Sequence, residues 1–534
     1  MTFERVAPES VGIYSGAIMN MLDAIREDGA ELHGFMLLRH GKVCAEGSAA
    51  PYRADVPHSM YSFSKSFTST AIGFAVQEGL LSLTDRVTDL LPEYMPSYIG
   101  SNLAQLTLKD LLTMSCGHED EIDGRAGSLE EFLKRFFEHP FKYIPGTHFM
   151  YNTAGTNVLS AILTKKTGRT VTEFLRPRLF EPLEMNNPVC MTMTGTRVEM
   201  GGAGFFVELE DMARFISFVA NRGSWNGRQL LNSAWFDEAS AAQIDNYQPG
   251  GTPDWSSGYG FQFWRCAPEG LFRADGAYGQ YGIVMPEQDA VLVMQAATVS
   301  MQTLLDSIWT SLLPGIVDGV LPEDRPSAAV LKYRLSTLEL GALRPVRNPG
   351  AEESIQGAAF LQVLPDPKES PSEKDSAGEN PAEEGKAEEE ADEGAAILGA
   401  LSLWGGSPKF PPTEWIHFDF EGNELVLTVR ESRGTASVVI GLDGHFRENV
   451  FGFTHIAGCG TWRSADILEL ELRDISLVAG VRYLMEFDET GMTLTMDPTL
   501  PEKDGIIVIP DRRHHRFLRA EGTTNTVSNH YWDS

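Results

Sequence analysis

The chain has 534 residues, which at roughly 100–200 residues per domain corresponds to two to four domains. Lys and Arg total 43 against 74 Asp and Glu, giving a formal charge of −31. This balance argues against binding to a nucleic-acid backbone or an anionic membrane surface. Hydrophobic residues make up 42% of the chain, which is enough for a sizeable core.

The N-terminal segment and the cysteines indicate where the protein works. Residues 1–10 lack the basic flank and apolar run of a signal peptide. No stretch of the sequence approaches the ~18 apolar residues of a transmembrane helix. The five cysteines are scattered and never spaced CxxC, so we expect reduced thiols and predict a cytoplasmic location.

The first 320 residues mix helix and strand patterns and are predicted to form an α/β (α+β) domain. We expect strands at 34–39 and 42–46, joined by a turn at His40 and Gly41, and then a helix over 63–79. Helices are predicted next at 111–114, 129–137 and 153–165. Strands are predicted at 259–265 and 283–294.

Residues 365–394 form an acidic segment of different composition. They hold four prolines, no aromatic residue, and alanine as the only aliphatic type. Such a segment cannot bury enough surface to offset its ordering entropy, so we predict a disordered insertion. An acidic binding tail is the alternative to a solvated linker or loop. Residues 321–350 are predicted to connect the first domain to the region that contains this insertion.

The region 351–520 shows alternation of apolar and polar residues, apart from the insertion. The alternating apolar residues are Ile416, Phe418, Phe420, Leu425, Leu427, Val429, Leu468, Leu470, Leu472, Tyr483, Met485, Phe487, Met492, Leu494 and Met496. Short strands at this spacing indicate an antiparallel β-barrel or sandwich. Residues 521–534 are polar and are predicted to be a flexible tail.

An SxxK tetrapeptide, Ser62 to Lys65, begins the predicted helix 63–79. Residues three apart share a helix face, so the Lys65 amine can approach the Ser62 hydroxyl. The N–H groups of the first turn favour developing negative charge at the same place. A serine becomes a nucleophile when a neighbouring base accepts its proton, and a half-buried lysine can be that base. The alternative is a helix-capping serine beside a surface lysine.

Two later motifs add to this candidate site. Tyr151, Asn152 and Thr153 precede a predicted helix, and Gly276–Gln280 precedes a predicted strand. Each also has a structural explanation, because buried tyrosines usually pack without catalysing and glycines often mark a plain turn.

Together, these motifs resemble the serine β-lactamase-related family of penicillin-recognising hydrolases, which combines SxxK, a Tyr motif and a Lys- or His-x-Gly strand. Further similar stretches are residues 60–69 (MYSFSKSFTS), 106–117 (LTLKDLLTMSCG), 145–151 (PGTHFMY), and 201–206 (GGAGFF) with 211–214 (DMAR). The resemblance covers roughly residues 7–315. It implies a β-lactamase/transpeptidase-like catalytic domain, with an antiparallel sheet flanked by helices and a helical subdomain. The C-terminal region resembles the lipocalin-like domains appended to some members.

The resemblance also implies roles for individual residues. Ser62, Lys65 and Tyr151 would be catalytic, and the backbone N–H groups of Ser62 and Gln280 would bind the oxyanion. Asn152, Thr153, Ala277, Tyr278 and Gly279 would line the substrate site. The sequence departs from the family pattern at two of these positions, because Thr153 stands where Asn is usual and Ala277 stands where Lys or His is usual.

Other candidate sites are weaker. Residues 117–123 (GHEDEID) are dense in possible metal ligands, but an exposed acidic loop explains them equally well. Residues 511–516 (DRRHHR) form a basic stretch that we expect at a strand edge. We predict no metal and no cofactor.

The predicted function is hydrolysis of a small ester or a short amide through an acyl-enzyme on Ser62. Ala277 replaces the usual Lys or His of the strand motif, and the loss of this cationic side chain argues against efficient β-lactam hydrolysis. The alternatives are a peptidase for D-amino-acid or cyclic peptides, and a binding or regulatory protein on a degenerate hydrolase fold. The predicted partner is a small-molecule substrate, with no nucleic acid and no membrane, and the oligomeric state is open.

Overall fold

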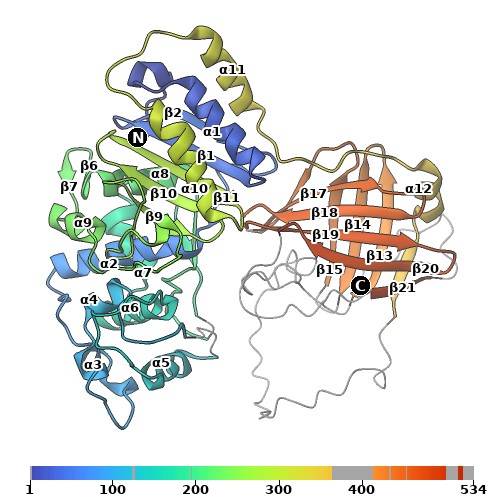
Figure 1. Cartoon of the computed structure of the whole chain (residues 1–534). Coiled ribbons are helices and arrows are strands. Elements are labelled where there is room, and N and C mark those ends of the chain that lie inside the picture. Colours follow the sequence, from blue (N-terminus) through green and yellow to red (C-terminus); the bar gives the residue numbers. More distant parts are fainter. Residues whose placement is uncertain are drawn as a thin grey trace. The chain divides into compact units, whose positions relative to one another are not determined.

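The computed structural model describes residues 3–122, 127–193, 195–363, 413–431, 434–452, 454–500 and 515–520. The chain divides into two compact units, Met1–Leu340 and Gly341–Ser534 (Figure 1). The predicted acidic insertion 365–394 and the predicted tail 521–534 lie outside the described residues. Within the described ranges, no helix is both long and apolar enough to cross a membrane.

A six-stranded antiparallel sheet forms the centre of the first unit (Figure 1). Its order is β2-β1-β11-β10-β9-β8. The strands are β1 (Glu31–Arg39), β2 (Lys42–Ser48), β8 (Trp264–Arg265), β9 (Phe272–Gly276), β10 (Gln280–Met285) and β11 (Ala290–Ala297). The N-terminal strand β1 therefore pairs with β11, the last strand of the unit.

Both faces of this sheet are covered. Phe35 and Leu37 of β1 pack into one hydrophobic core with helices α1 (Ser15–Glu27) and α10 (Met301–Ser307). Met36 and Leu38 pack into a second core with α2 (Ser64–Gln77) and α8 (Leu209–Ala220). Alternate residues of a strand point to opposite faces, so a strand buried on both sides is apolar almost throughout. The sheet is thus a central layer between two helical layers, as predicted from the family resemblance.

The helices of the first unit carry the remaining core residues. They are α1 (Ser15–Glu27), α2 (Ser64–Gln77), α3 (Val87–Leu90), α4 (Leu108–Leu112), α5 (Leu129–Glu138), α6 (Thr153–Thr167), α7 (Val171–Leu175), α8 (Leu209–Ala220), α9 (Ser233–Ser240), α10 (Met301–Ser307) and α11 (Arg325–Ser336). Short strands β3 (His58–Ser59), β4 (Val189–Cys190) and β5 (Phe205–Val207) form a small sheet, and β6 (Ser224–Trp225) pairs with β7 (Arg228–Gln229).

Three local predictions differ from the structure. The helix expected over 111–114 begins earlier, because Thr107 and Asp110 form a capping box, and it ends before Met114, whose φ is 55°. The strand expected over 259–265 is reduced to β8, since Gln262 has a φ of 65°. The strand expected over 283–294 is the hairpin β10–β11, whose turn, residues 286–289, begins with proline.

The second unit is a closed β-barrel formed by strands β12 to β21, which pair antiparallel except for the parallel contact of β15 with β17. Its strands are β12 (Ala359–Gln362), β13 (Thr413–Glu421), β14 (Glu424–Glu431), β15 (Gly434–Gly441), β16 (Arg447–Phe451), β17 (Thr454–Trp462), β18 (Ile467–Asp474), β19 (Gly480–Phe487), β20 (Gly491–Pro498) and β21 (His515–Arg519). Pairing of β15 with β17 closes a ring of nine strands, and β16 pairs with β17 outside the ring. Helix α12 (Pro349–Ile355) precedes the barrel.

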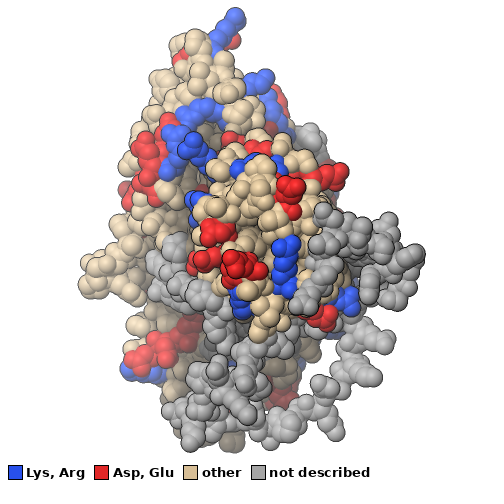
Figure 2. All heavy atoms as spheres, turned by 90° about the vertical axis from the view of Figure 1, so that its right-hand side faces the viewer, with Lys and Arg blue, Asp and Glu red and all other residues tan. Residues whose placement is uncertain are grey.

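The barrel core includes most of the alternating apolar residues predicted from the sequence, together with others such as Phe360, Val438 and Phe517. Leu425, Leu470 and Met496 are fully buried in it, and Phe420 and Phe487 pack at its margin. Charged residues lie on the outer side of the strands, where Arg447 contacts both Asp443 and Glu424. Acidic and basic side chains are interspersed on the face shown in Figure 2, and such pairs compensate part of the charge locally.

Candidate active site

Ser62 lies on a single 3₁₀ turn, Tyr61–Phe63, directly before helix α2. The preceding residue, Tyr61, has a φ of 45°, a left-handed conformation that costs a non-glycine residue roughly 1–3 kcal/mol. The turn is held by its surroundings, because the Tyr61 ring packs edge-on against Tyr278 at a centroid distance of 5.3 Å. This conformation leaves Ser62 partly exposed while its neighbours on both sides are buried.

Lys65 is the buried cation next to this serine. Its Nζ lies 3.0 Å from Ser62 Oγ, 2.7 Å from the carbonyl oxygen of Gly202 and 3.3 Å from Thr153 Oγ1. All three partners are uncharged. Burial lowers the pKa of Lys65 to about 7, although Glu121 and Asp275 act in the opposite direction. The amine is therefore available as a neutral base near pH 7.

Tyr151 lies beside Ser62 and Lys65. Burial raises the pKa of its phenol, although the nearby Ser62 side chain acts in the opposite direction. Lys65 Nζ lies 4.9 Å from the Tyr151 ring centroid. The ring also stacks on Trp264 at a centroid distance of 5.4 Å and meets Tyr259 edge-on at 6.3 Å. Since its pKa is raised, Tyr151 keeps its proton at neutral pH, and Lys65 is the better proton acceptor.

The glycine-rich stretch 201–206 supplies the third partner of Lys65. Thr68 Oγ1 donates to the Gly201 carbonyl, and the Gly202 N–H donates to Asn157 Oδ1, so helices α2 and α6 both fix this stretch. A Cβ at Gly201 would lie 2.5 Å from Thr68 Oγ1, which explains the need for glycine there. This stretch resembles the family in sequence, but the contact of Gly202 with Lys65 could not be predicted from it.

The Tyr motif presents Thr153 to the site and turns Asn152 away from it. Asn152 caps helix α6 by accepting from the Gly155 N–H, and its Nδ2 donates to His118 Nδ1 at 3.2 Å. Asn152 is completely buried, whereas Thr153 is partly exposed and contacts Lys65. We therefore remove Asn152 from the proposed substrate-binding residues and retain Thr153.

Residues 277–279 form the turn between β9 and β10 rather than the beginning of a strand. Of these residues and Gln280, only Ala277 is partly exposed. Gln280 is completely buried and pairs with Gly276 in the sheet, so its N–H cannot reach a substrate. Tyr278 packs on Tyr61, and Gly279 is also buried. Only Ala277 of this turn remains a candidate for contact with substrate.

Gly276, at the end of β9, lies against the backbone of the nucleophile turn. A Cβ there would lie 2.2 Å from the Met60 carbonyl oxygen and 3.2 Å from the Phe63 nitrogen. The structure thus offers a second match to the family's strand motif, Ala274-Asp275-Gly276. One match begins at Ala274 and the other begins at Ala277. An alanine therefore occupies the family's Lys or His position in both matches.

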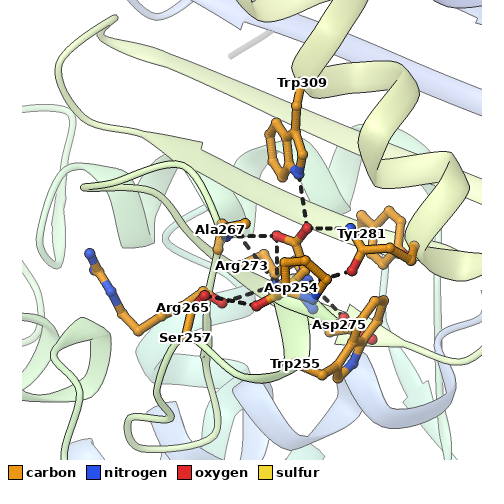
Figure 3. Close-up of polar contacts among 12 residues, drawn as sticks. Asp254, Trp255, Ser257, Arg265, Ala267, Arg273, Asp275, Tyr281 and Trp309 are labelled. Atoms are coloured by element: carbon orange, nitrogen blue, oxygen red, sulfur yellow. Dashed lines mark hydrogen bonds and ion pairs between the residues drawn. The ribbon is translucent and has the colours of Figure 1, made fainter. Parts of the chain in front are cut away.

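A buried charge cluster lies behind this strand (Figure 3). Arg273 is completely buried, and its Nε donates to Asp275 Oδ2 at 2.7 Å. Asp254 Oδ1 lies 3.7 Å from Arg273 Nη1, and the guanidinium lies over the Trp255 ring at 4.6 Å. The positive charge of Arg273 is therefore neutralised within the protein.

Asp254 connects this cluster to the C-terminal helices of the unit. Its carboxylate accepts from Trp309 Nε1 at 3.0 Å, from Gln302 Nε2 at 2.6 Å and from the Ala267 N–H at 2.9 Å (Figure 3). Burial raises the pKa of Asp275 to about 6, and Arg273 opposes this rise. Sequence reasoning did not identify this cluster, since nothing in the spacing of 254, 273 and 275 brings these residues together.

The acidic side chains of residues 117–123, considered above as possible metal ligands, contact different partners. Glu119 pairs with Lys142, and Asp120 Oδ1 lies 2.7 Å from His139 Nε2. Glu121 Oε1 accepts from the Thr153 N–H at 3.1 Å. Among the described residues, no three His, Cys, Asp or Glu side chains form a group suited to a metal, and Asp123 lies outside them.

The fold and this site define a class: β-lactamase/transpeptidase-like proteins, with a serine at the start of a helix that packs on an antiparallel sheet. A family model described as Beta-lactamase matches residues 23–306, more than half of the chain. The chain belongs to the β-lactamase family.

Named relatives lie in the same family. The chain is 26% identical over 308 residues to the 6-aminohexanoate-dimer hydrolase of Paenarthrobacter ureafaciens, covering 53% of this chain and 76% of that protein. It is 28% identical over 217 residues to esterase EstB of Burkholderia gladioli, covering 35% of this chain and 55% of that one. Both names denote hydrolases, which supports hydrolase activity for this member. A penicillin-binding protein homologue from Caulobacter crescentus superposes with a TM-score of 0.46 at 17% identity, covering 58% of this chain and 99% of that one.

Proposed function

We propose that the protein is a serine hydrolase that cleaves a small ester or a short amide through an acyl-enzyme on Ser62. The observation that carries this proposal is the 3.0 Å contact between Ser62 Oγ and the buried Lys65 amine. Lowering of the Lys65 pKa to about 7 supports the role of this amine as the base. The proposed catalytic residues are Ser62, Lys65 and Tyr151.

In the proposed reaction, Ser62 Oγ attacks the substrate carbonyl carbon while its proton passes to Lys65 Nζ. The tetrahedral oxyanion is stabilised by the N–H groups of Ser62 and Ala277, the latter replacing Gln280, at ~3–4 kcal/mol per donor. When the intermediate collapses, the proton passes through the Tyr151 hydroxyl to the leaving alcohol or amine. Water then attacks the acyl-enzyme with the same groups, releasing the acid and restoring Ser62.

The substrate class follows from the groups around Ser62. An alanine stands at the position of the family's cationic side chain in either match of the strand motif. A substrate carboxylate would therefore lack its usual partner, which disfavours β-lactams. The names of the relatives, an esterase and a 6-aminohexanoate-dimer hydrolase, are compatible with an ester or a short amide.

The five cysteines are all free, which supports the proposed cytoplasmic location.

The test is hydrolysis of p-nitrophenyl butyrate by the wild type and Ser62→Ala, together with intact-mass detection of the acyl-enzyme. We expect Ser62→Ala to lose at least ~10³-fold in kcat and to form no adduct. The matched control is Ser69→Ala on the same helix, because the buried Ser69 hydroxyl has no hydrogen-bond partner in the described part of the chain. Equal activity of wild type and Ser62→Ala would refute this function. Ligand binding without acylation would then favour a binding protein, and a peptide panel would separate an esterase from a D-peptidase.

A further inference from the structure

We propose that Glu121 makes the active site selective for substrates that carry a positively charged ammonium group. This inference rests on the proposed hydrolase function and names a substrate class for it. It draws on the acidic stretch 119–121, whose three carboxylates have different partners in the structure.

The first two carboxylates of this stretch contact basic side chains. Glu119 pairs with Lys142, and Asp120 Oδ1 lies 2.7 Å from His139 Nε2. Within the described residues, no basic side chain pairs with Glu121. Its one hydrogen bond within the described part of the chain comes from the Thr153 N–H at 3.1 Å, which occupies Oε1 and leaves Oε2 without a partner. The Glu121 side chain is exposed, so a substrate can reach this oxygen.

The position of Glu121 relates it to the reacting groups. Thr153, which donates its N–H to Glu121, also contacts Lys65 through its hydroxyl at 3.3 Å. The Glu121 charge is close enough to act on both Lys65 and Tyr151. A substrate whose carbonyl lies at Ser62 would therefore have its neighbouring atoms within the field of this carboxylate.

No exposed cation in the described surroundings balances Glu121. Ala274 and Ala277 stand at the two possible positions of the family's cationic residue. Arg273 is completely buried and is paired with Asp275. Lys65 is buried against uncharged partners and is largely deprotonated above pH 7. The accessible charge near Ser62 is thus negative, which attracts an ammonium group and repels a carboxylate.

The experiment compares isosteric pairs of esters that differ in one charge. On the acyl side, p-nitrophenyl 3-aminopropanoate is compared with p-nitrophenyl butanoate. On the alcohol side, 2-(trimethylammonio)ethyl acetate is compared with 3,3-dimethylbutyl acetate. The readout is the ratio of kcat/KM for the charged and neutral members at one pH. Since both members meet the same Lys65, a change in the pKa of that amine cancels in the ratio.

We expect the wild type to favour the charged member in at least one pair. In Glu121→Gln this ratio should fall by roughly three- to tenfold, and in Glu121→Lys it should fall further, as for a partly exposed charge pair. The matched control is Asp120→Asn, which removes the neighbouring carboxylate charge that contacts His139 rather than Thr153 and should leave the ratio unchanged. Thermal unfolding of each variant shows whether the fold is retained.

Three results would overturn the inference. The first is a wild-type ratio at or below one in both pairs. The second is a charge preference that survives Glu121→Gln. The third is a loss of activity that affects both members of a pair equally, because Glu121 would then act only through Lys65. If the wild type hydrolyses none of the four esters, the proposed hydrolase function itself fails, and that failure is distinct from turnover without charge preference.

Discussion

Two of the buried basic side chains of the first unit, Lys65 and Arg273, have opposite surroundings. Lys65 is 1% exposed and contacts a hydroxyl of Ser62, a hydroxyl of Thr153 and a carbonyl of Gly202. Arg273 is 0% exposed and lies between the carboxylates of Asp254 and Asp275. The two side chains are equally removed from water, so their partners decide what happens to each charge.

The two cations respond differently to burial. Burial lowers the pKa of Lys65 to about 7, since its uncharged partners do not compensate for lost hydration. Burial also acts against the charge of Arg273, but Asp275 and Asp254 raise its pKa overall. Lys65 is therefore a group able to exchange a proton, whereas Arg273 carries a fixed charge that supports strand β9. Burial alone therefore does not identify a base.

The largest effect is expected from Lys65→Met, which removes the amine and retains an unbranched side chain. Turnover of p-nitrophenyl butyrate should fall by at least ~10³-fold, because Ser62 loses its proton acceptor. Stability should change little, since the partners of Lys65 are uncharged. Steady-state kinetics and urea unfolding measure the two quantities. Lys65→Arg should also be inactive, and activity in that variant would contradict the need for a neutral base.

The second effect is on stability and concerns Arg273→Met. We expect a loss of about 3–5 kcal/mol in the free energy of unfolding, because two carboxylates remain buried without their counter-charge. Without Arg273, the folded-state pKa of Asp275 rises further above its unfolded value. The loss should therefore be larger at pH 8 than at pH 5, where Asp275 can be protonated. Urea unfolding at both pH values measures it.

The double variant Arg273→Met/Asp275→Asn is the control for this prediction. It removes the charge of both partners, so it should recover part of the stability and reduce the pH dependence. Equal destabilisation at both pH values in the single variant would show that lost packing on Trp255, rather than charge, is the cause.

The smallest effect is the pH dependence of the wild type. The active form of Lys65 is the neutral amine, which is present above its pKa. We therefore expect kcat/KM to be level above pH ~7.5 and to fall about tenfold per unit below pH ~7. A pH profile with p-nitrophenyl butyrate tests this expectation. If kcat/KM instead rises with pH up to about pH 10, the surroundings of Lys65 do not lower its pKa as described.

Much of the fold could be predicted from local sequence patterns. The hairpin at 34–46, the α2 and α6 helices and the alternating residues of the barrel follow from periodicity and turn residues. The errors lie where the backbone adopts a left-handed conformation, at Met114 and Gln262, or where proline interrupts an apolar run. These features depend on individual residues rather than on periodicity.

The candidate site could be predicted less completely. Spacing identified Ser62, Lys65 and Tyr151 as candidates, and they meet in the structure. A motif does not show which of two adjacent side chains faces the site, so Asn152 and Thr153 could not be distinguished before the α6 cap was seen. Contacts that join distant segments, such as Lys65 to Gly202, leave no local pattern in the sequence.

Pairing of β1 with β11 sets the order in which the chain can acquire its structure. Glu31 lies opposite Ala297, so this strand pair must wait until almost the whole first unit has been synthesised. Successive barrel strands, such as β13 and β14, are sequence neighbours and need no such delay. Gly276 of β9 and the nucleophile turn are also far apart in the sequence, so they come together late in the synthesis of the first unit.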